Sequence, residues 1–448
     1  VYVVVDDHKS GDFSPYVLKS ENRGRRWKSI ASNLPERHVL WRIVQDHVKP
    51  GLMFLGTEFG VFFTVNGGGE WTKLKGGAPN IPFRDLVIQT RENDLVGATF
   101  GRSFYILDDY SPLREATADL LRNDTVLFPV RKAQWYVPRR PLGCGDRGCL
   151  SSQGDGYFIA PNPEFGATFT YYLPEAINSR KDARRETEKE REKNNQNVTF
   201  TSWDAIRTEQ LEDDPAIVLT VRNGSGNVVR QIEGPAEAGF HRVAWNLRYP
   251  PVNAWIPEEE RQPSYIPHGG VLVAPGKFTV SMQTRVDGVL SDVQGTERFD
   301  VVSIREPTLP GSAQEQRVVF ENQRDELIRA TEGTVKTIDE IVAELEAVEE
   351  MLLSSTADAS LYEIANSLQQ RLNLQRDRIA GNMTRENFKD TDEVSVSARL
   401  QHARFDPMSG AYGPTPEQRE SLQIARAVYD EVRQELSNLV DVEYAGLK

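Results

Sequence analysis

A short motif occurs twice near the start of the chain, and its spacing constrains the fold more than any other feature. The two copies contain, at matching positions, Ser20, Asn22, Gly24 and Trp27, and Thr64, Asn66, Gly68 and Trp71. Both follow the pattern (Ser/Thr)-x-Asn-x-Gly-x-x-Trp between β-like segments, 44 residues apart. Four-stranded propeller blades repeat every ~40–45 residues. The spacing therefore predicts a repeated antiparallel β architecture.

Residues 1–112 alternate short β-branched and aromatic runs with turn residues throughout. Expected strands are 1–5, 16–19, 39–45, 52–55, 61–65, 86–89, 95–99 and 103–107. They amount to about two and a half blades, whereas a propeller needs about four to eight. The chain is therefore expected to begin inside a repeat. The remaining blades would come from residues upstream or from another chain.

Residues 113–305 change to longer strands with alternating apolar side chains, as at Ile217, Leu219 and Val221. This periodicity predicts a β-sandwich. A charged helical insertion is expected at about 174–210. Within it, Arg180–Lys193 has seven basic and five acidic side chains and one apolar residue, Ala183. Such a composition predicts a solvated helix or a mobile loop.

Residues 306–448 are predicted to form a helical domain. Apolar residues recur at three- and four-residue spacing, at Ile338, Ile341, Leu345, Val348 and Leu352, at Leu361, Ile364, Leu368 and Leu372, and at Leu422, Ala425, Val428, Val432, Leu436 and Leu439. The sequence Thr415-Pro416-Glu417-Gln418 has the residues of a capping box. These helices are expected to form an antiparallel bundle or to pack on the sandwich.

Composition excludes some classes of function. No apolar run approaches the roughly 20 residues that span a bilayer. The formal net charge of −13 argues against nucleic acid or anionic lipid as the main partner. The chain of 448 residues is long enough for two to four domains.

The two cysteines, Cys144 and Cys149, lie in a glycine-rich segment. They can form a small disulfide loop, or they can be two free thiols. A metal site is disfavoured because no other Cys or His lies nearby in sequence. The segment also matches G-x-G-x-x-G, but it lacks the strand and helix that a dinucleotide site requires. The sequence thus predicts no cofactor.

With these residues assembled, nearly the whole chain resembles the C-terminal portion of a family of large bacterial secreted proteins. These proteins carry sialidase-like BNR, or Asp-box, repeats, are related to the sortilin propeller, and are often labelled glycosyl hydrolases. The resemblance rests on the two motifs and on residues 56–60, 94–109, 160–173, 202–204, 238–247 and 273–280. It implies a propeller, an Ig-like sandwich and helices in that order, and a periplasmic or extracellular location. Asn22 and Asn66 replace the usual Asp, and Asn makes the same local turn bonds.

Catalytic chemistry finds little support in the residues. A glycosidase needs two carboxyl groups at a fixed separation. The candidates at strand ends are Asp6, Asp7, Glu58, Asp108 and Asp109, and Arg102 is the one arginine placed to serve a sialidase. Solvation of loop ends accounts for each acid. His241 is interpreted as a structural histidine. The tryptophans Trp135, Trp203, Trp245 and Trp255 could line a sugar platform, but a buried core is the favoured interpretation.

Two functional hypotheses follow. The first is a non-catalytic exported protein, either an interaction module or an extrinsic subunit of an assembly at a membrane surface. Its partners would be proteins, with carbohydrate as a further candidate ligand and membrane association only through a partner. The alternative is a sialidase-like glycoside hydrolase whose catalytic residues lie mostly on other blades.

Overall fold

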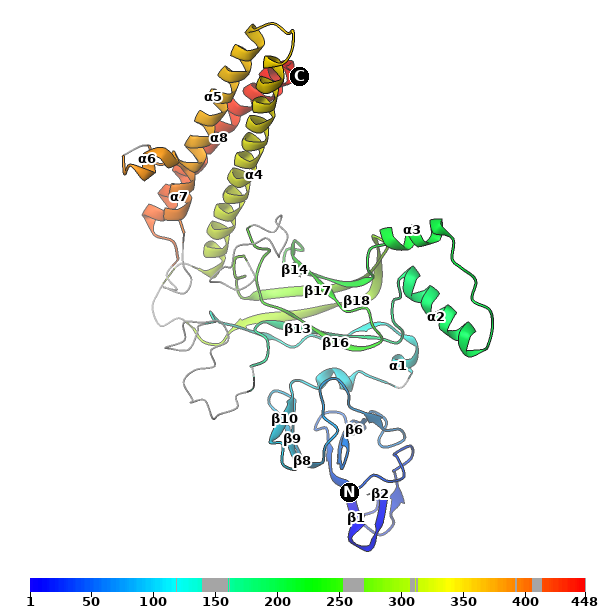
Figure 1. Ribbon diagram of the computed structural model, residues 1–448. Helices are drawn as coiled ribbons and strands as arrows, with labels where there is room; N and C mark the ends of the chain where they lie inside the picture. Colours follow the sequence, from blue (N-terminus) through cyan, green and yellow to red (C-terminus); the bar gives the residue numbers. More distant parts are fainter. Residues whose placement is uncertain are drawn as a thin grey trace. The chain divides into compact units, whose positions relative to one another are not determined.

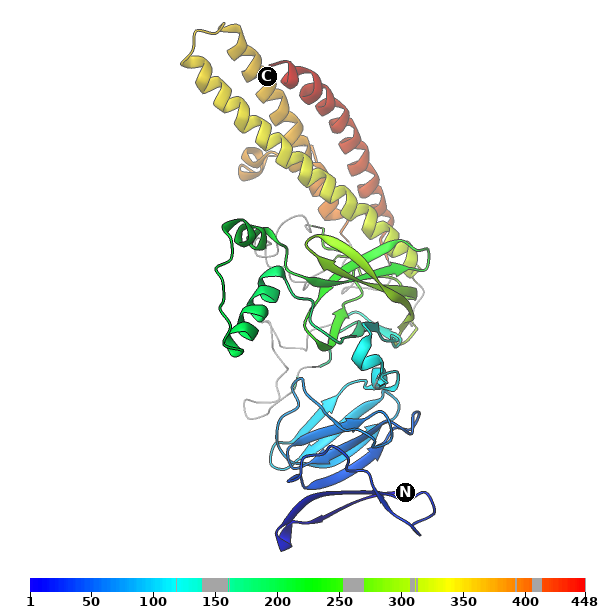
Figure 2. The same cartoon turned by 90° about the vertical axis from the view of Figure 1, so that its right-hand side faces the viewer.

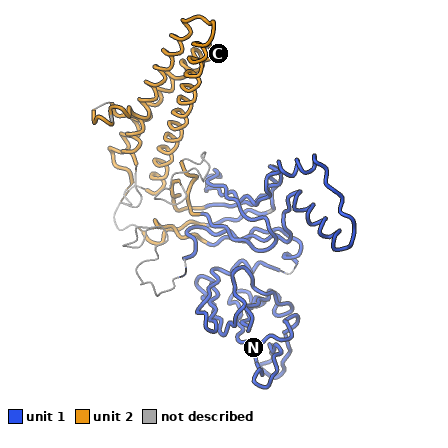
Figure 3. Tube along the Cα trace, viewed as in Figure 1, with its two compact units in different colours: residues 1–131, 160–245, 278–299 blue, residues 132–159, 246–277, 300–448 orange. Residues whose placement is uncertain are grey.

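The computed structural model describes residues 1–117, 119–138, 160, 162–252, 270–306, 311, 313–390, 393–404 and 413–447. The chain forms two compact units, coloured separately in Figure 3. Unit 1 comprises 1–131, 160–245 and 278–299, and unit 2 comprises 132–159, 246–277 and 300–448. Each unit draws on segments that are distant in sequence.

Unit 1 begins with three antiparallel sheets, drawn in blue to cyan in Figures 1 and 2. The first sheet contains β1 (Tyr2–Asp7), β2 (Asp12–Lys19) and β3 (Lys28–Ser29), with η1 (His8–Ser10) between β1 and β2. The second contains β4 (Leu40–Gln45), β5 (Met53–Thr57), β6 (Gly60–Thr64) and β7 (Thr72–Lys73), and the third contains β8 (Phe83–Gln89), β9 (Asp94–Thr99) and β10 (Phe104–Leu107). Strands neighbouring in sequence pair with one another, so each sheet is a meander.

The second sheet is buried on both faces, because alternate side chains of β5 enter two different cores. Phe54 packs in a cluster with Phe83 of the third sheet. Its neighbour Leu55 packs in a cluster with Val17 of the first sheet. Every residue of β5 is buried. Full burial of such a side chain stabilises the fold by roughly 1.5–3 kcal/mol, so the three sheets support one another.

A buried carboxylate ties the second sheet to η2 (Ser111–Arg114), which follows the third sheet. Asp46 accepts hydrogen bonds from the Tyr110 hydroxyl (2.7 Å) and from Arg114 Nη2 and Nε (2.8 and 2.9 Å). It also accepts from the backbone N–H groups of Val48 and Lys49 (3.1 and 2.6 Å). Burial raises the pKa of Asp46, but the bonds from Arg114, Tyr110 and Lys49 outweigh it and hold the pKa well below its usual range.

The rest of unit 1 contains two further sheets that share an aromatic core. One pairs β11 (Val126–Leu127), β13 (Ala167–Leu173) and β16 (Gly239–Trp245), after α1 (Leu120–Asn123). The other pairs β15 (Val228–Gly234), β14 (Ala216–Asn223), β17 (Gly276–Val286) and β18 (Val289–Ser303) in that order. Phe169 and Trp245 of the first of these sheets contact Phe278 and Phe299 of the second, with ring centroids 5.4–6.3 Å apart.

The charged segment forms α2 (Arg180–Lys193), which is followed by α3 (Trp203–Leu211), and Figure 1 shows the two as a helical pair. No described residue of α2 is buried. Arg184 forms two hydrogen bonds to Glu209 of α3, at 2.7 and 2.9 Å. The pair is thus held by charged side chains rather than by an apolar core.

Unit 2 contains β12 (Ala133–Trp135), which pairs in parallel with the end of β18, and a helical region. The helices are α4 (Gln314–Leu353), α5 (Ser360–Ala380), α6 (Met383–Asn387), α7 (Val396–His402), α8 (Pro416–Asn438), η4 (Leu439–Tyr444) and α9 (Ala445–Leu447). Figures 1 and 2 show α4, α5 and α8 side by side. The predicted capping box of Thr415 and Gln418 is present at α8.

The coarse prediction of mainly β sheets followed by a helical region is confirmed. Within the predicted apolar stripe of α5, Ile364 is an exception, because it is 49% exposed. The buried face of α5 runs through Ala365, Leu368, Leu372 and Ile379, which leaves Ile364 at the edge of that face. Among the described residues, no helix is long and apolar enough to cross a membrane.

Candidate functional site

The two sequence motifs form the same hydrogen-bonded turn. In the first, Ser20 Oγ accepts from Gly24 N (2.8 Å), and Asn22 Oδ1 accepts from Ser20 Oγ (3.1 Å) and Arg26 N (2.8 Å). The second turn repeats each bond with Thr64, Asn66, Gly68 and Glu70, at 2.9–3.0 Å. A hydroxyl and an amide oxygen thus satisfy the same backbone donors in both copies.

The backbone of the two turns also matches. Two consecutive residues are left-handed in each copy, Arg23 and Gly24 with φ of 59° and 84°, and Gly67 and Gly68 with 73° and 92°. Glycine adopts this conformation without a steric penalty. At Gly68 a Cβ would additionally lie 2.9 Å from Ile30 Cβ, so the second turn has no room for a side chain there.

The two tryptophans occupy the same place in the motif, but they differ in burial. Trp71 is 3% exposed, and its Nε1 donates to the Ile30 carbonyl at 2.7 Å. Asn33 exchanges two further bonds with the Trp71 backbone. Trp27 is 43% exposed. Trp71 is covered by the segment between the first and second sheets, and no described segment occupies the equivalent position beside Trp27.

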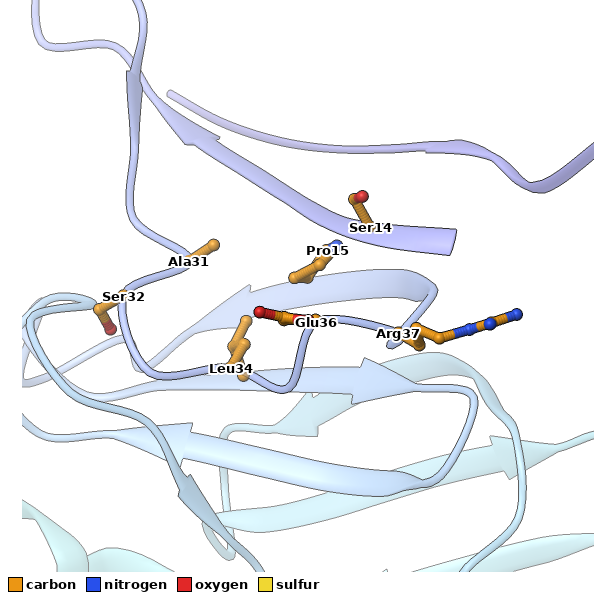
Figure 4. Close-up of a pocket in the computed structure, with 7 residues that line it drawn as sticks. All are labelled: Ser14, Pro15, Ala31, Ser32, Leu34, Glu36 and Arg37. Carbon is orange, nitrogen blue, oxygen red and sulfur yellow. The ribbon is translucent and has the colours of Figure 1, made fainter. Parts of the chain in front are cut away.

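A groove of about 910 Å³ lies between the two turns. It is lined by Lys19, Glu21, Asn22, Arg26, Trp27, Lys28, Ser29, Ile30, Ser32, Asn66, Gly67, Gly68 and Gly69. Three of the charged residues are basic and one is acidic. A smaller hollow of about 420 Å³, shown in Figure 4, lies nearby and is lined by residues 14–15, 31–32, 34 and 36–37.

The single acid of the groove is paired. Lys19 Nζ lies 2.8 Å from Glu21 Oε1. The hydrogen bond lowers the pKa of Glu21 and raises that of Lys19. Both therefore stay charged at neutral pH, and they offset one another. The remaining lining charges, Arg26 and Lys28, make the groove basic on a chain with a net charge of −13.

The carboxylates that the sequence offers as catalytic candidates interact with different partners. Asp6 contacts His8, and Glu58 accepts from Trp41 Nε1 at 3.0 Å. Asp109 accepts from Ser111, whereas burial and the nearby Asp94 raise the pKa of Asp108. His241 Nε2 lies 2.6 Å from the Glu237 carbonyl oxygen. In the part of the chain that is described, no group of three or more His, Cys, Asp or Glu residues is placed to hold a metal.

The other residues named from sequence have mixed outcomes. Trp135 and Trp245 are buried, as expected of core residues. Trp203 is 74% exposed and contacts Phe200, so its assignment to the core was wrong; it begins α3, which has no buried residue. Trp255 and the pair Cys144 and Cys149 lie outside the described residues.

Comparison with known proteins adds little. No family model and no curated protein matches the chain. Among solved structures, it is similar to the extracellular domain of BT4673 from B. thetaiotaomicron in two structures. They have TM-scores of 0.17, 10% identity, coverage of 64% and 67% of this chain, and coverage of 28% and 30% of those chains.

It is also similar to PorZ, described as an essential bacterial surface component of the type-IX secretion system of Porphyromonas gingivalis. Here the TM-score is 0.21 and the identity 14%, over 67% of this chain and 37% of PorZ. The chain spans about a third of the length of these structures. At such scores the similarity establishes neither a shared fold nor a shared function.

Proposed function

We propose that this chain belongs to an exported bacterial protein that works by binding rather than by catalysis. It would be an interaction module, or an extrinsic structural subunit of an assembly at the periplasmic or outer face of a membrane. The observation that carries this proposal is a stack of repeated sheets with two outward apolar faces. Among the carboxylates named above, Asp6, Glu58 and Asp109 have structural partners, namely His8, Trp41 and Ser111.

The stack is best explained as part of a β-propeller, with residues 1–112 as blades and each motif as an Asp-box-like turn. Two features support this assignment. The turns are equivalent bond for bond. Moreover, β5 packs on neighbouring sheets through both faces, as an inner blade does. Residues 113–305 would then form an Ig-like sandwich with its charged helical insertion, and residues 306–448 a helical domain.

Both ends of the stack expose apolar side chains. On the third sheet, Val87 and Ile106 both pair with Val96, and Val87, Phe104 and Ile106 are 54–69% exposed. On the first sheet, Val5 and Tyr16 are paired and exposed. Contiguous exposed apolar surface of this kind marks an interaction site. Further blades or a partner protein would cover these faces.

Site-specific photo-crosslinking in a native bacterial host tests the proposal. Benzoylphenylalanine replaces Phe104 in the exposed face of the third sheet, and in a control it replaces Phe388, which is 81% exposed in the helical region. We expect a discrete protein adduct from position 104 and none from position 388. Failure of position 104 to crosslink, together with hydrolysis of aryl glycosides by the purified protein, would favour the glycoside hydrolase instead.

Export has a separate test in the cysteines. An oxidising compartment predicts a disulfide between Cys144 and Cys149, across a short glycine-rich segment. Mass spectrometry after non-reducing extraction with alkylation should detect the crosslinked peptide. Two alkylated thiols in protein from the native host would contradict export to an oxidising compartment.

A further inference from the structure

Four basic side chains lie within residues 23–28, in the first turn and at the start of β3, and the acid in this turn, Glu21, is paired with Lys19. Within the described part of the chain, the side chains of Arg23, Arg25, Arg26 and Lys28 form no hydrogen bond or ion pair. All four residues are exposed, and a local excess of like charge attracts anions. This cluster of charge therefore favours the binding of an anionic ligand.

The second turn shows that the fold itself does not need these charges. At the positions of Arg23 and Arg25 it has Gly67 and Gly69, and it makes the same hydrogen bonds. Arg23 moreover has a φ of 59°, a conformation that costs a non-glycine residue energy. A strained residue that the turn does not require points to a role for its side chain.

The groove beside this turn offers hydrogen-bond donors as well as charge. Asn22 and Asn66 use Oδ1 within their own turns, which leaves each Nδ2 group available. Arg26 and Lys28 add charged donors, and all four residues line the groove. Its volume of about 910 Å³ is in the range of ligand-binding pockets.

We propose that the groove between the two turns binds an anionic glycan, whose carboxylate or sulfate groups pair with Arg26 and Lys28. This inference rests on the proposed binding function and names its ligand class. Ser29 and Ser32 add uncharged hydroxyl groups to the lining, which suit sugar hydroxyls. A nucleic acid fits less well, because single strands need a longer basic track. The basic residues here are confined to positions 19–28, on a chain of net charge −13.

Fluorescence anisotropy on the full chain tests the proposal. The probes are a labelled heparin hexasaccharide, which is sulfated, and a labelled oligogalacturonate, which is carboxylated. Uncharged dextran and a single-stranded oligonucleotide serve as comparison ligands. We expect at least one acidic glycan to bind, to weaken as salt rises because surface charges are screened, and to bind more tightly than both comparison ligands.

Matched variants separate the groove from general charge. R26Q/K28Q removes two cations that line the groove and retains the Arg26 backbone bond, and we expect at least ~tenfold weaker binding. R91Q/K336Q removes the same charge from exposed positions elsewhere and should bind like the wild type. R23G/R25G gives the first turn the glycines of the second, so it should fold and yet bind more weakly.

Three results would overturn the proposal. They are absence of binding by both acidic glycans at ~1 mM, equal effects of the groove and control variants, and tighter binding of the oligonucleotide. The proposed binding function is judged separately: a protein adduct at position 104 without glycan affinity would refute the groove ligand and leave that function standing.

Discussion

Replacing Asp46 with Asn tests how the second sheet is tied to the segment after the third. Both carboxylate oxygens of Asp46 accept hydrogen bonds, and the donors are Tyr110, Arg114 and two backbone N–H groups. Asn has the same shape but turns one acceptor into an NH₂ group. That group would face donors, and the Arg114 guanidinium would lose its counterion.

The expected loss of stability in D46N follows from the burial of the Asp46–Arg114 ion pair. Removing one partner of a buried ion pair costs about 3–5 kcal/mol, because the other charge remains uncompensated. The Asp46 side chain is fully buried, whereas that of Arg114 is 15% exposed and keeps some contact with water. We therefore expect about 3 kcal/mol for D46N. The control D85N breaks a pair with Arg42 in which both side chains are more than half exposed, so about 0–1 kcal/mol is expected.

Native-state hydrogen exchange with mass spectrometry measures these costs locally, which suits a chain of several domains. Peptides from 40–64 should lose protection in D46N, and peptides from 416–438 should not change. Because the folded pKa of Asp46 lies below its unfolded value, its stabilisation is present above about pH 4 and is lost as pH falls further. The difference between D46N and wild type should shrink accordingly. Equal protection in D46N and D85N at pH 7 would refute this reasoning.

Three further outcomes are expected. R23G should stabilise the first turn by about 0.5–1 kcal/mol, because it relieves the strain of a left-handed arginine. G68A should destabilise the second turn by about 2 kcal/mol through backbone strain and the clash with Ile30. Urea unfolding of each variant measures the change in the free energy of unfolding. Burial raises the folded pKa of Glu321 to about 7, so wild type should lose stability relative to E321Q as pH rises from about 4.5 to 7, by roughly 3 kcal/mol in thermal unfolding. Deleting 180–193 should cost less than about 2 kcal/mol, because α2 buries nothing; a larger loss in urea unfolding would show that the segment is docked.

Features that depend on neighbouring residues could be predicted from the sequence. The turn bonds of Asn22 and Asn66 span four residues, so the motif alone contains every group that makes them. The capping box at Thr415 is equally local. Helical periodicity identified the buried face of α8 for the same reason, since its stripe lies within one element.

Features that depend on distant segments could not be predicted from the sequence. Trp27 and Trp71 occupy the same place in the same motif, yet only Trp71 is covered, because burial depends on which segment lies opposite. The hydrogen bond between Tyr110 and Asp46 joins residues 64 positions apart, and neither residue lies in a sequence motif that predicts the bond. The basic groove was missed although its signal, four cations within residues 23–28, was present in the sequence; what the sequence lacked was the second turn as its opposite wall.

The pair of turns separates what the fold requires from what it merely permits. Hydroxyl, amide and left-handed glycine recur in both copies because the backbone donors must be satisfied in both. The arginines occur in one copy, where Arg23 takes a conformation that the other copy assigns to glycine. If Arg23 only kept the protein soluble, it would be as useful at an unstrained position. Arg26 lines the groove and Arg23 lies in the same turn, so their concentration there is better explained by a bound anion than by folding. R23G should therefore make the protein more stable and weaken ligand binding at the same time.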